Sequence, residues 1–246
     1  MMQLNPKPGI RIPNPESRWI GMVAAFRWEV RPLLRRDVAV KRLRSDLYSL
    51  CLAGKPVLLA ISGMGIENSF RAAQALLRDF PLRGLVTVGF AGALSETLDI
   101  GDIVVADSVV EESTQERFDC RQDLLPVKFV GQGSLLCVPE VVSAAGDKKR
   151  LNQKWGAVAA DMESAGVARA AASAGLAFCA IKSITDSSQQ TISIDFRRCR
   201  SEHGILTSGR ILREGIRTRQ AASDLWRLAQ GARRAAGSLA TALYAL

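Results

Sequence analysis

Three acidic residues, Glu29, Glu163 and Asp186, each follow a short apolar run of the kind that forms a buried strand. In open parallel sheets, ligands bind beyond the carboxyl ends of the strands. Residues placed directly after strands are therefore the first candidates for chemistry. The pattern predicts that these three carboxyl groups share one edge of a sheet.

Position alone supports a chemical role most clearly at Asp186. It follows Ile184-Thr185 at the end of an apolar run, where burial would disfavour the ionised carboxyl and retain a proton for donation to a leaving group. Glu163 stands at the start of a helical pattern, where the helix dipole alone would stabilise a carboxylate. Glu29, taken alone, is a polar residue that ends a strand.

Two glycine-containing segments follow other apolar runs, and we expect each to form a turn. Glycine lets backbone amides approach a small ligand closely, although a tight turn can also serve packing alone. The first segment lacks the third glycine of the dinucleotide fingerprint, and no acidic ribose ligand follows it, so NAD fits poorly. The candidate site residues in these segments are Ser62, Gly63, Met64, Gly65, Phe90, Ala91 and Gly92.

The elements that would position these residues alternate between strand and helix. The run Val57 to Ile61 leads into helical spacing at Phe70, Ala73 and Leu77, and a long amphipathic helix occupies the C-terminal segment. Such alternation predicts an α/β fold: a three-layer αβα arrangement around a mixed, mostly parallel central sheet. We expect residues 1–18 to form an N-terminal extension and residues 19–246 a single domain.

Composition excludes several classes of protein. The five cysteines are scattered without a CxxC pair, and His203 is the only histidine, so neither a zinc site nor a Ser-His-Asp hydrolase is expected. We expect no metal and no cofactor. The first residues lack the apolar run of a signal peptide, and no stretch is apolar enough to span a bilayer, which predicts a cytoplasmic protein without stable membrane insertion.

The net charge of +9 does not by itself indicate nucleic-acid binding. The basic residues are spread through helical stretches without interleaved aromatic residues or a recognisable nucleic-acid motif. We therefore expect no nucleic-acid partner. A solvated basic surface explains the charge, and attraction to an anionic membrane or substrate is the alternative.

Longer strings carry a family resemblance. Asp161-Met162-Glu163-Ser164-Ala165-Gly166-Val167-Ala168, followed by Ser183-Ile184-Thr185-Asp186, resembles the paired signature of methylthioadenosine/S-adenosylhomocysteine nucleosidases and related purine nucleoside phosphorylases. Segments 89–94 and 101–107 are similar to the family's central region, and the first glycine segment and the start around Glu29 are similar to other parts of it. The resemblance runs from about Trp19 to Asp186.

The resemblance implies a role for each candidate. Asp186 would donate a proton toward purine N7, Glu163 would accept hydrogen bonds from the ribose hydroxyls beside Met162, and Glu29 would deprotonate an attacking water. The two glycine segments would line the pocket. The family's phosphorylase/hydrolase-like fold and its homo-oligomers, most often dimers among the hydrolases, are implied in the same way.

Two departures from the family pattern are visible. Phe90 stands where the nucleosidases usually have a small hydroxyl residue, which removes a sugar or phosphate contact there. The tail from Gln190 to Arg200 is closer to bacterial subgroups described only as phosphorylase-like, including hopanoid-associated ones. The residue that stacks on the base does not align between Cys137 and Lys149.

Three functions follow as hypotheses. The first is hydrolysis of a purine, adenosine-type nucleoside, indicated by Glu29 and by the missing Gly-Asp-Pro phosphate loop of hexameric phosphorylases. The second is phosphorolysis, with phosphate as a second ligand; its candidate cations are Arg27, Arg31, Arg71 and Lys182. The third is a non-catalytic nucleoside-binding module. Neither the base nor the 5′ substituent is determined by the sequence.

Overall fold

A computed structural model of the chain describes residues 19–36, 40–125, 127, 131–194, 196, 198–199 and 208–244. The predicted N-terminal extension, residues 1–18, lies outside the described residues, as do His203 and three positions of the Gln190 to Arg200 segment. No helix within the described ranges is long and apolar enough to cross a bilayer.

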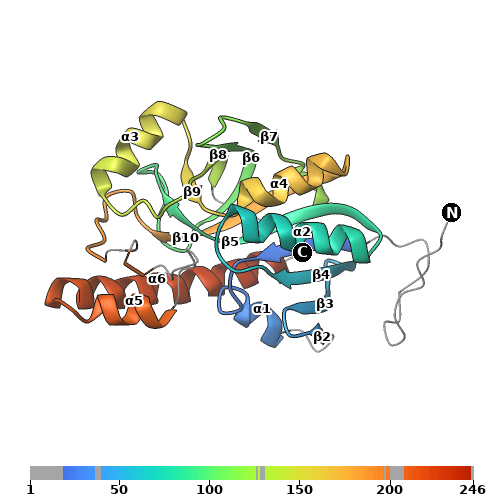
Figure 1. The fold of residues 1–246 in the computed structure, drawn as a ribbon, viewed down its shortest axis with the longest axis horizontal. Helices are drawn as coiled ribbons and strands as arrows, with labels where there is room; N and C mark the ends of the chain where they lie inside the picture. The colour runs from blue at the N-terminus through green and yellow to red at the C-terminus, as the bar shows by residue number, and fades with distance from the viewer. Residues whose placement is uncertain are drawn as a thin grey trace.

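Four parallel strands form the centre of the sheet, in the order β4, β1, β5, β10. Their bounds are Lys55–Ile61 for β4, Trp19–Ala24 for β1, Leu82–Ala93 for β5 and Ala177–Asp186 for β10. All four end at the same edge of the sheet (Figure 1). The predicted convergence of strand ends therefore has a structural basis.

The remaining strands extend this centre and close part of it. β3 (Leu47–Leu52) and β2 (Lys41–Arg44) add to β4 in antiparallel order. On the other side, β6 (Ile103–Glu111) pairs with β10, and β8 (Gly131–Cys137) pairs with β6. β9 (Ala159–Asp161) pairs with both β8 and β5, so the strands β5, β10, β6, β8 and β9 form a closed ring. β7 (Arg117–Asp119) lies outside this ring on β6. The mixed α/β sheet is as predicted, and the parallel strands are its central ones.

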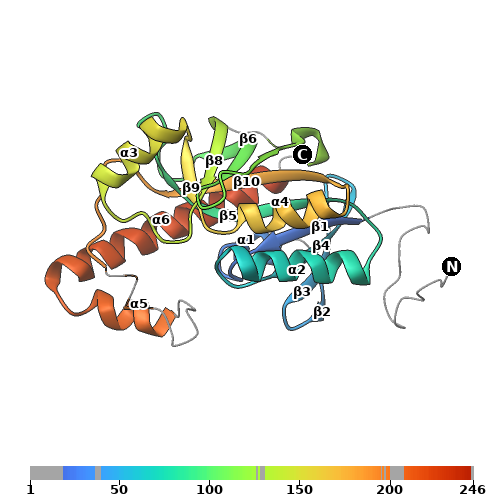
Figure 2. The same ribbon diagram turned by 45° about the horizontal axis from the view of Figure 1, so that its top comes forward.

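Helices cover both faces of the sheet. α2 (Ile66–Asp79) and α4 (Ser164–Ser173) lie on one face, and α1 (Arg31–Arg36) and α6 (Arg219–Tyr244) lie on the other (Figures 1 and 2). Alternate residues of β1 serve the two layers: Val23 packs in the core on the α2 and α4 side, and Met22 packs with residues of α1 and α6. The predicted three-layer arrangement and the long C-terminal helix are confirmed.

Helices α2 and α4 touch closely, and this contact brings the first glycine segment to Glu163. Gly166 makes the approach possible, because a Cβ at this position would lie 2.1 Å from the carbonyl oxygen of Ile66. The shorter helices are η1 (Gln122–Leu124), α3 (Ala145–Trp155) and α5 (Ser208–Gly215). Of these, α3 reaches the site.

One expected turn is part of a strand. Gly89 to Gly92 continues β5, whose last residues pair with β10 and β9. Here the glycines make room for carboxyl groups. A Cβ at Gly89 would lie 3.0 Å from Oε2 of Glu29, and a Cβ at Gly92 would lie 3.0 Å from Oδ2 of Asp186.

Candidate active site

Glu29, Glu163 and Asp186 line one cavity of about 180 Å³ at the carboxyl edge of the central strands. Their exposed fractions are 5%, 8% and 7%, so all three acids are buried. Of the other predicted site residues, Met64, Phe90, Ala91, Gly92 and Met162 line the same cavity. The prediction that segments far apart in the chain meet around one hollow therefore agrees with the structure.

Ser62, Gly63 and Gly65 are outside the lining of this cavity. The Ser62 hydroxyl donates to the backbone carbonyls of Ala24 and Gly63, at 3.3 Å and 2.7 Å. The amide of Gly65 donates to Oε1 of Glu163 at 3.0 Å. The first glycine segment thus orients a carboxylate of the site, whereas we expected its amides to face a ligand.

Glu29 occupies the turn between β1 and α1. Its Oε2 accepts a hydrogen bond from the amide of Phe26 at 3.0 Å. Burial, and next the charge of Glu163, raise the pKa of Glu29 to about 8. A carboxylate whose proton affinity lies near neutral pH is well suited to act as a general base.

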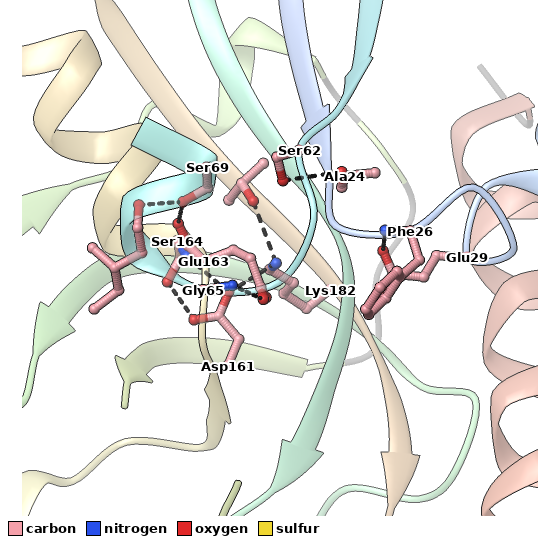
Figure 3. A network of polar contacts seen from close by, with 12 residues as sticks. Ala24, Phe26, Glu29, Ser62, Gly65, Ser69, Asp161, Glu163, Ser164 and Lys182 are labelled. Carbon is pink, nitrogen blue, oxygen red and sulfur yellow. Dashed lines mark hydrogen bonds and ion pairs between the residues drawn. The ribbon is translucent and has the colours of Figure 1, made fainter. Parts of the chain in front are cut away.

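Glu163 and Asp161 lie around a buried ammonium group, that of Lys182 (Figure 3). The Nζ of Lys182 is 2.8 Å from Oδ2 of Asp161 and 3.3 Å from Oγ1 of Thr87. Burial opposes the charge of Lys182, but Asp161 and Glu163 outweigh it and hold the pKa of the ammonium above its ordinary value. Burial raises the pKa of Glu163, and Lys182 acts in the opposite direction.

Asp161 also fixes the start of helix α4. Its Oδ2 accepts from the amide of Ser164 at 3.0 Å, and its Oδ1 accepts from the Ser164 hydroxyl at 2.5 Å. The Ser69 hydroxyl of α2 donates to the carbonyl of Glu163 at 2.8 Å. These bonds hold the backbone that carries Met162 and Glu163 at the cavity wall.

Lys148 is the main site residue that the sequence did not reveal. It lies in α3, is 1% exposed and lines the cavity. Its Nζ forms an ion pair with Oδ2 of Asp186 and donates to the carbonyl of Ser187 at 2.8 Å. Oδ1 of Asp186 accepts from the Thr185 hydroxyl at 2.7 Å. Asp186 is therefore held on both oxygens.

Lys148 carries little sequence signal. It stands in the run Gly146-Asp147-Lys148-Lys149-Arg150, which is typical of a solvated helix face. Its neighbours behave in that way: Arg150 pairs with Asp147 on the surface. Only the contact of Lys148 with Asp186 and Ser187, at the end of β10, distinguishes it from them.

Aromatic side chains form one wall of the cavity. The ring of Trp28 stacks on Phe26 at 5.6 Å between centroids and meets Phe90 at 5.1 Å with a tilt of 58°. Trp28 is 47% exposed, so this wall stands at the mouth. The cavity therefore combines an apolar wall with four acids and one lysine, which suits a ligand that has a flat apolar part and a hydroxylated part.

The four cations expected for a phosphate site do not line the cavity. The guanidinium of Arg27 lies 5.8 Å from the ring centre of Tyr48, Arg71 pairs with Glu67 on α2, and Lys182 is held by Asp161. Arg31 lies on the exposed side of α1. Among the described residues, the cation in the lining is Lys148, and it is paired with Asp186.

The fold and the site together define a class. This is an α/β protein whose parallel strand ends enclose a small cavity with buried carboxyl groups, an arrangement that binds small polar ligands. The sequence matches the phosphorylase superfamily over residues 20–128 and 117–214. The chain belongs to that superfamily.

Individual relatives are nucleosidases. The 5'-methylthioadenosine/S-adenosylhomocysteine nucleosidase of Thermotoga maritima is 25% identical over 203 residues, which cover 76% of this chain and 93% of the relative. The enzyme of the same description from Baumannia cicadellinicola is 35% identical over 94 residues, covering 37% of this chain and 41% of the relative.

A solved structure agrees with the fold. The Neisseria meningitidis 5'-methylthioadenosine/S-adenosylhomocysteine nucleosidase, in complex with methylthio-immucillin-A, superimposes with a TM-score of 0.67 at 19% identity. The match covers 93% of this chain and 100% of that one. It confirms the predicted phosphorylase/hydrolase-like fold.

Proposed function

We propose that the protein hydrolyses the N-glycosidic bond of a purine nucleoside of the adenosine type, with water as the nucleophile. The observation that carries the proposal is the meeting of Glu29, Glu163 and Asp186 around one cavity of about 180 Å³. The nucleosidase relatives support the same reaction class.

Cleavage of this bond passes through a ribosyl cation and sends electrons into the base. The base therefore needs a proton, and Asp186, paired through its Oδ2 with the Lys148 ammonium group, relays a proton from that ammonium to the base. Glu163, fixed by the Gly65 amide, accepts hydrogen bonds from the ribose hydroxyls beside Met162. Glu29 takes the proton of the water that attacks the anomeric carbon. The aromatic wall receives the flat or apolar part of the substrate.

The cations of the site favour water over phosphate as the nucleophile. Phosphorolysis needs a free cationic group near the sugar, and within the described part of the chain each candidate is engaged elsewhere or points away from the cavity. The alternative, a nucleoside phosphorylase, requires Lys148 to leave Asp186 and receive the anion. The position of Lys148 in the cavity lining is the observation that supports this alternative.

The test is release of free base from adenosine, methylthioadenosine and S-adenosylhomocysteine in phosphate-free buffer, followed with and without added phosphate. Hydrolysis predicts equal release in both, and D186N should reduce it strongly while leaving nucleoside binding mostly intact. Release that depends on phosphate would replace hydrolysis with phosphorolysis. Binding of a nucleoside without any release of base would indicate a non-catalytic nucleoside-binding module.

Several expectations accompany this proposal as predictions. They are a homo-oligomer, with a dimer favoured, a cytoplasmic location, and a nucleoside as the partner molecule without metal or cofactor. The likeness to hopanoid-associated proteins has no support from the relatives described above, and the 5′ substituent is not part of the proposal.

A further inference from the structure

Large apolar side chains are exposed on the helical hairpin formed by α5 and the first half of α6. Leu212, Ile216 and Trp226 have exposed fractions of 58%, 66% and 63%. Among the described residues, Trp28 at the cavity mouth is the other large apolar residue with comparable exposure. Apolar side chains gathered in this way on a surface mark a contact with a partner.

Helix geometry places the three side chains on the same side of the hairpin, because the Ile216 amide still donates to the Leu212 carbonyl at 3.1 Å and so continues the turn of α5. Figures 1 and 2 show α5 lying antiparallel beside α6, and the two helices touch where Gly215 faces Leu225, since a Cβ at Gly215 would lie 2.7 Å from the Leu225 side chain. Ile216 directly follows Gly215 in the chain, and Trp226 directly follows Leu225. Seen from one end of the hairpin, the two antiparallel helices turn in opposite senses. Moving one residue along each chain, from Gly215 to Ile216 and from Leu225 to Trp226, therefore rotates both side chains away from the contact toward the same side of the hairpin. Leu212 lies one turn before Ile216 on that side.

Arginines flank the apolar group. Arg219 and Arg233 stand seven residues before and after Trp226, which places them on the same exposed stripe of α6. Residues 208–244 hold seven arginines and two acids, a net charge of +5 out of +9 for the chain. Both acids are engaged within the chain: Glu214 pairs with Arg217, and Asp224 accepts from the amide of Ser193 at 2.8 Å.

The same hairpin supports the cavity. Leu225 and Leu228, on the inner side of α6, belong to the apolar cluster that also contains Met64 and Val141 of the cavity lining. The exposed side of the hairpin therefore lies one helix away from the site.

We propose that the hairpin surface, formed by Leu212, Ile216, Arg219, Trp226 and Arg233, docks on the surface of an anionic phospholipid bilayer. Leu212, Ile216 and Trp226 enter the headgroup region, where tryptophan is favoured, and the two arginines bind lipid phosphates. The protein lies on the bilayer and does not span it.

The positive charge of the hairpin surface, together with its apolar side chains, favours a bilayer over other kinds of partner. A second copy of the chain, packed through a two-fold axis, would set this surface against itself and bring the arginines together without acids to pair with them. A nucleic acid would contact the arginines but would leave Leu212 and Ile216 without apolar contacts. An anionic bilayer supplies both phosphates and an apolar layer.

The test is sedimentation of the purified full chain with vesicles of phosphatidylcholine alone and of phosphatidylcholine containing phosphatidylglycerol. We expect binding to the anionic vesicles, weakened by salt, and little binding to the neutral ones. R219E/R233E should weaken the partition by about 25-fold or more, since each arginine near an anionic surface contributes roughly fivefold. I216S/W226S should also release the protein.

The matched control is R71E/R78E. It makes the same charge change on α2, also seven residues apart, where the two side chains are 67% and 72% exposed. Its binding should stay within about threefold of the unaltered chain, because charges farther than a Debye length from the membrane are screened. Thermal melting checks that each variant is folded.

Three results would overturn the inference. The first is equal binding to both kinds of vesicle or to neither, and the second is unchanged binding of folded R219E/R233E. The third is a dimer in light scattering that I216S/W226S dissociates, which would assign the hairpin surface to a second copy. None of these measurements depends on the reaction at the cavity.

Discussion

At the scale of residues, the site is a set of charges whose burial gives each one a different tendency to hold a proton. Among the described residues, no cation forms an ion pair with Glu29, and its pKa rises to about 8, whereas Asp186 is held by Lys148. The ammonium of Lys148 supplies the proton at the Asp186 end of the cavity, and Glu29, once ionised, accepts a proton at the other end.

Replacing Glu29 by glutamine tests the base. Because a base must be ionised, kcat/KM of the unaltered enzyme should rise with pH on its acidic side and level off above about 8. E29Q should lower turnover by roughly 10²- to 10⁴-fold and remove this rise, while binding of a nucleoside changes little. Steady-state kinetics from about pH 5 to about pH 9, a range that spans the ordinary and the raised pKa of Glu29, measure it. An E29Q enzyme with the original pH profile would remove Glu29 from the reaction.

Lys148 is tested through stability as well as activity. K148M leaves Asp186 buried without its cation, which costs about 3 to 5 kcal/mol when a buried pair is broken. The loss in the free energy of unfolding should be larger in alkaline than in acidic buffer, because the abandoned carboxyl group can take up a proton in acid. Urea unfolding at both pH values measures this difference.

The double variant K148M/D186N is the control for that experiment. It removes the charge of both partners, so most of the lost stability should return while activity stays low. If K148M unfolds like the unaltered protein at every pH, the ion pair seen in the structure does not contribute to stability.

At the scale of elements, parallel strands carry out the assembly. β1, β5 and β10 are neighbours in the sheet, so residues at their ends meet regardless of the chain length between them. Helix α4 adds Glu163 by packing on α2, and α3 adds Lys148, which reaches Asp186. Close approach depends on glycine at Gly89, Gly92 and Gly166.

The strand glycine Gly92 offers a prediction at this scale. In G92A the new methyl group would lie 3.0 Å from Oδ2 of Asp186, so the carboxyl group must move by a few tenths of an ångström. Because catalysis depends on alignment, we expect kcat to fall about tenfold or more with a smaller effect on KM. G146A is the matched control, since nothing lies within 4 Å of a Cβ there. Equal kinetics for the two variants would contradict the contact.

In the molecule as a whole, the core contains buried ionisable groups, and their charges are stabilised by partners that only the assembled fold brings to them. Lys148 and Lys182 are both 1% exposed and are compensated by Asp186 and Asp161. Within the described part of the chain Glu29 has no ion-pair partner, and the charge of Lys182 offsets its burial only in part, so the fold bears a cost whenever that carboxyl group ionises.

This cost makes stability depend on pH in a defined direction. The folded pKa of Glu29 is about 8 against an ordinary value of 4.5, so between these values the unfolded chain has released a proton that the folded one keeps. The contribution of Glu29 to stability is therefore full in acid and is lost as the pH rises toward 8. E29Q should be more stable than the unaltered protein above about pH 8 by on the order of 5 kcal/mol, with little difference in acid.

Urea unfolding at both ends of this pH range measures the effect. E67Q makes the same chemical change at a glutamate whose side chain is 64% exposed, and it should show no pH-dependent difference. If E29Q and E67Q behave alike, Glu29 ionises in the folded protein without cost.

The sequence alone determined the features that depend on local patterns. Apolar runs marked the central strands, their ends marked Glu29, Glu163 and Asp186, and the apolar stripe marked α6, because burial imposes these patterns residue by residue. The order of strands and helices then limited the fold to a layered α/β sheet, which the structure has.

Features that depend on packing between elements became visible only once the chain was folded. Lys148 looks like its solvated neighbours until the fold brings it to Asp186 at the end of β10. The Gly89 to Gly92 segment looks like a turn until β9 and β10 pair with it, and the partner of the Gly65 amide is Glu163, which lies at the start of α4. Distances between residues far apart in the chain follow from how faces fit together, and no local pattern records that fit.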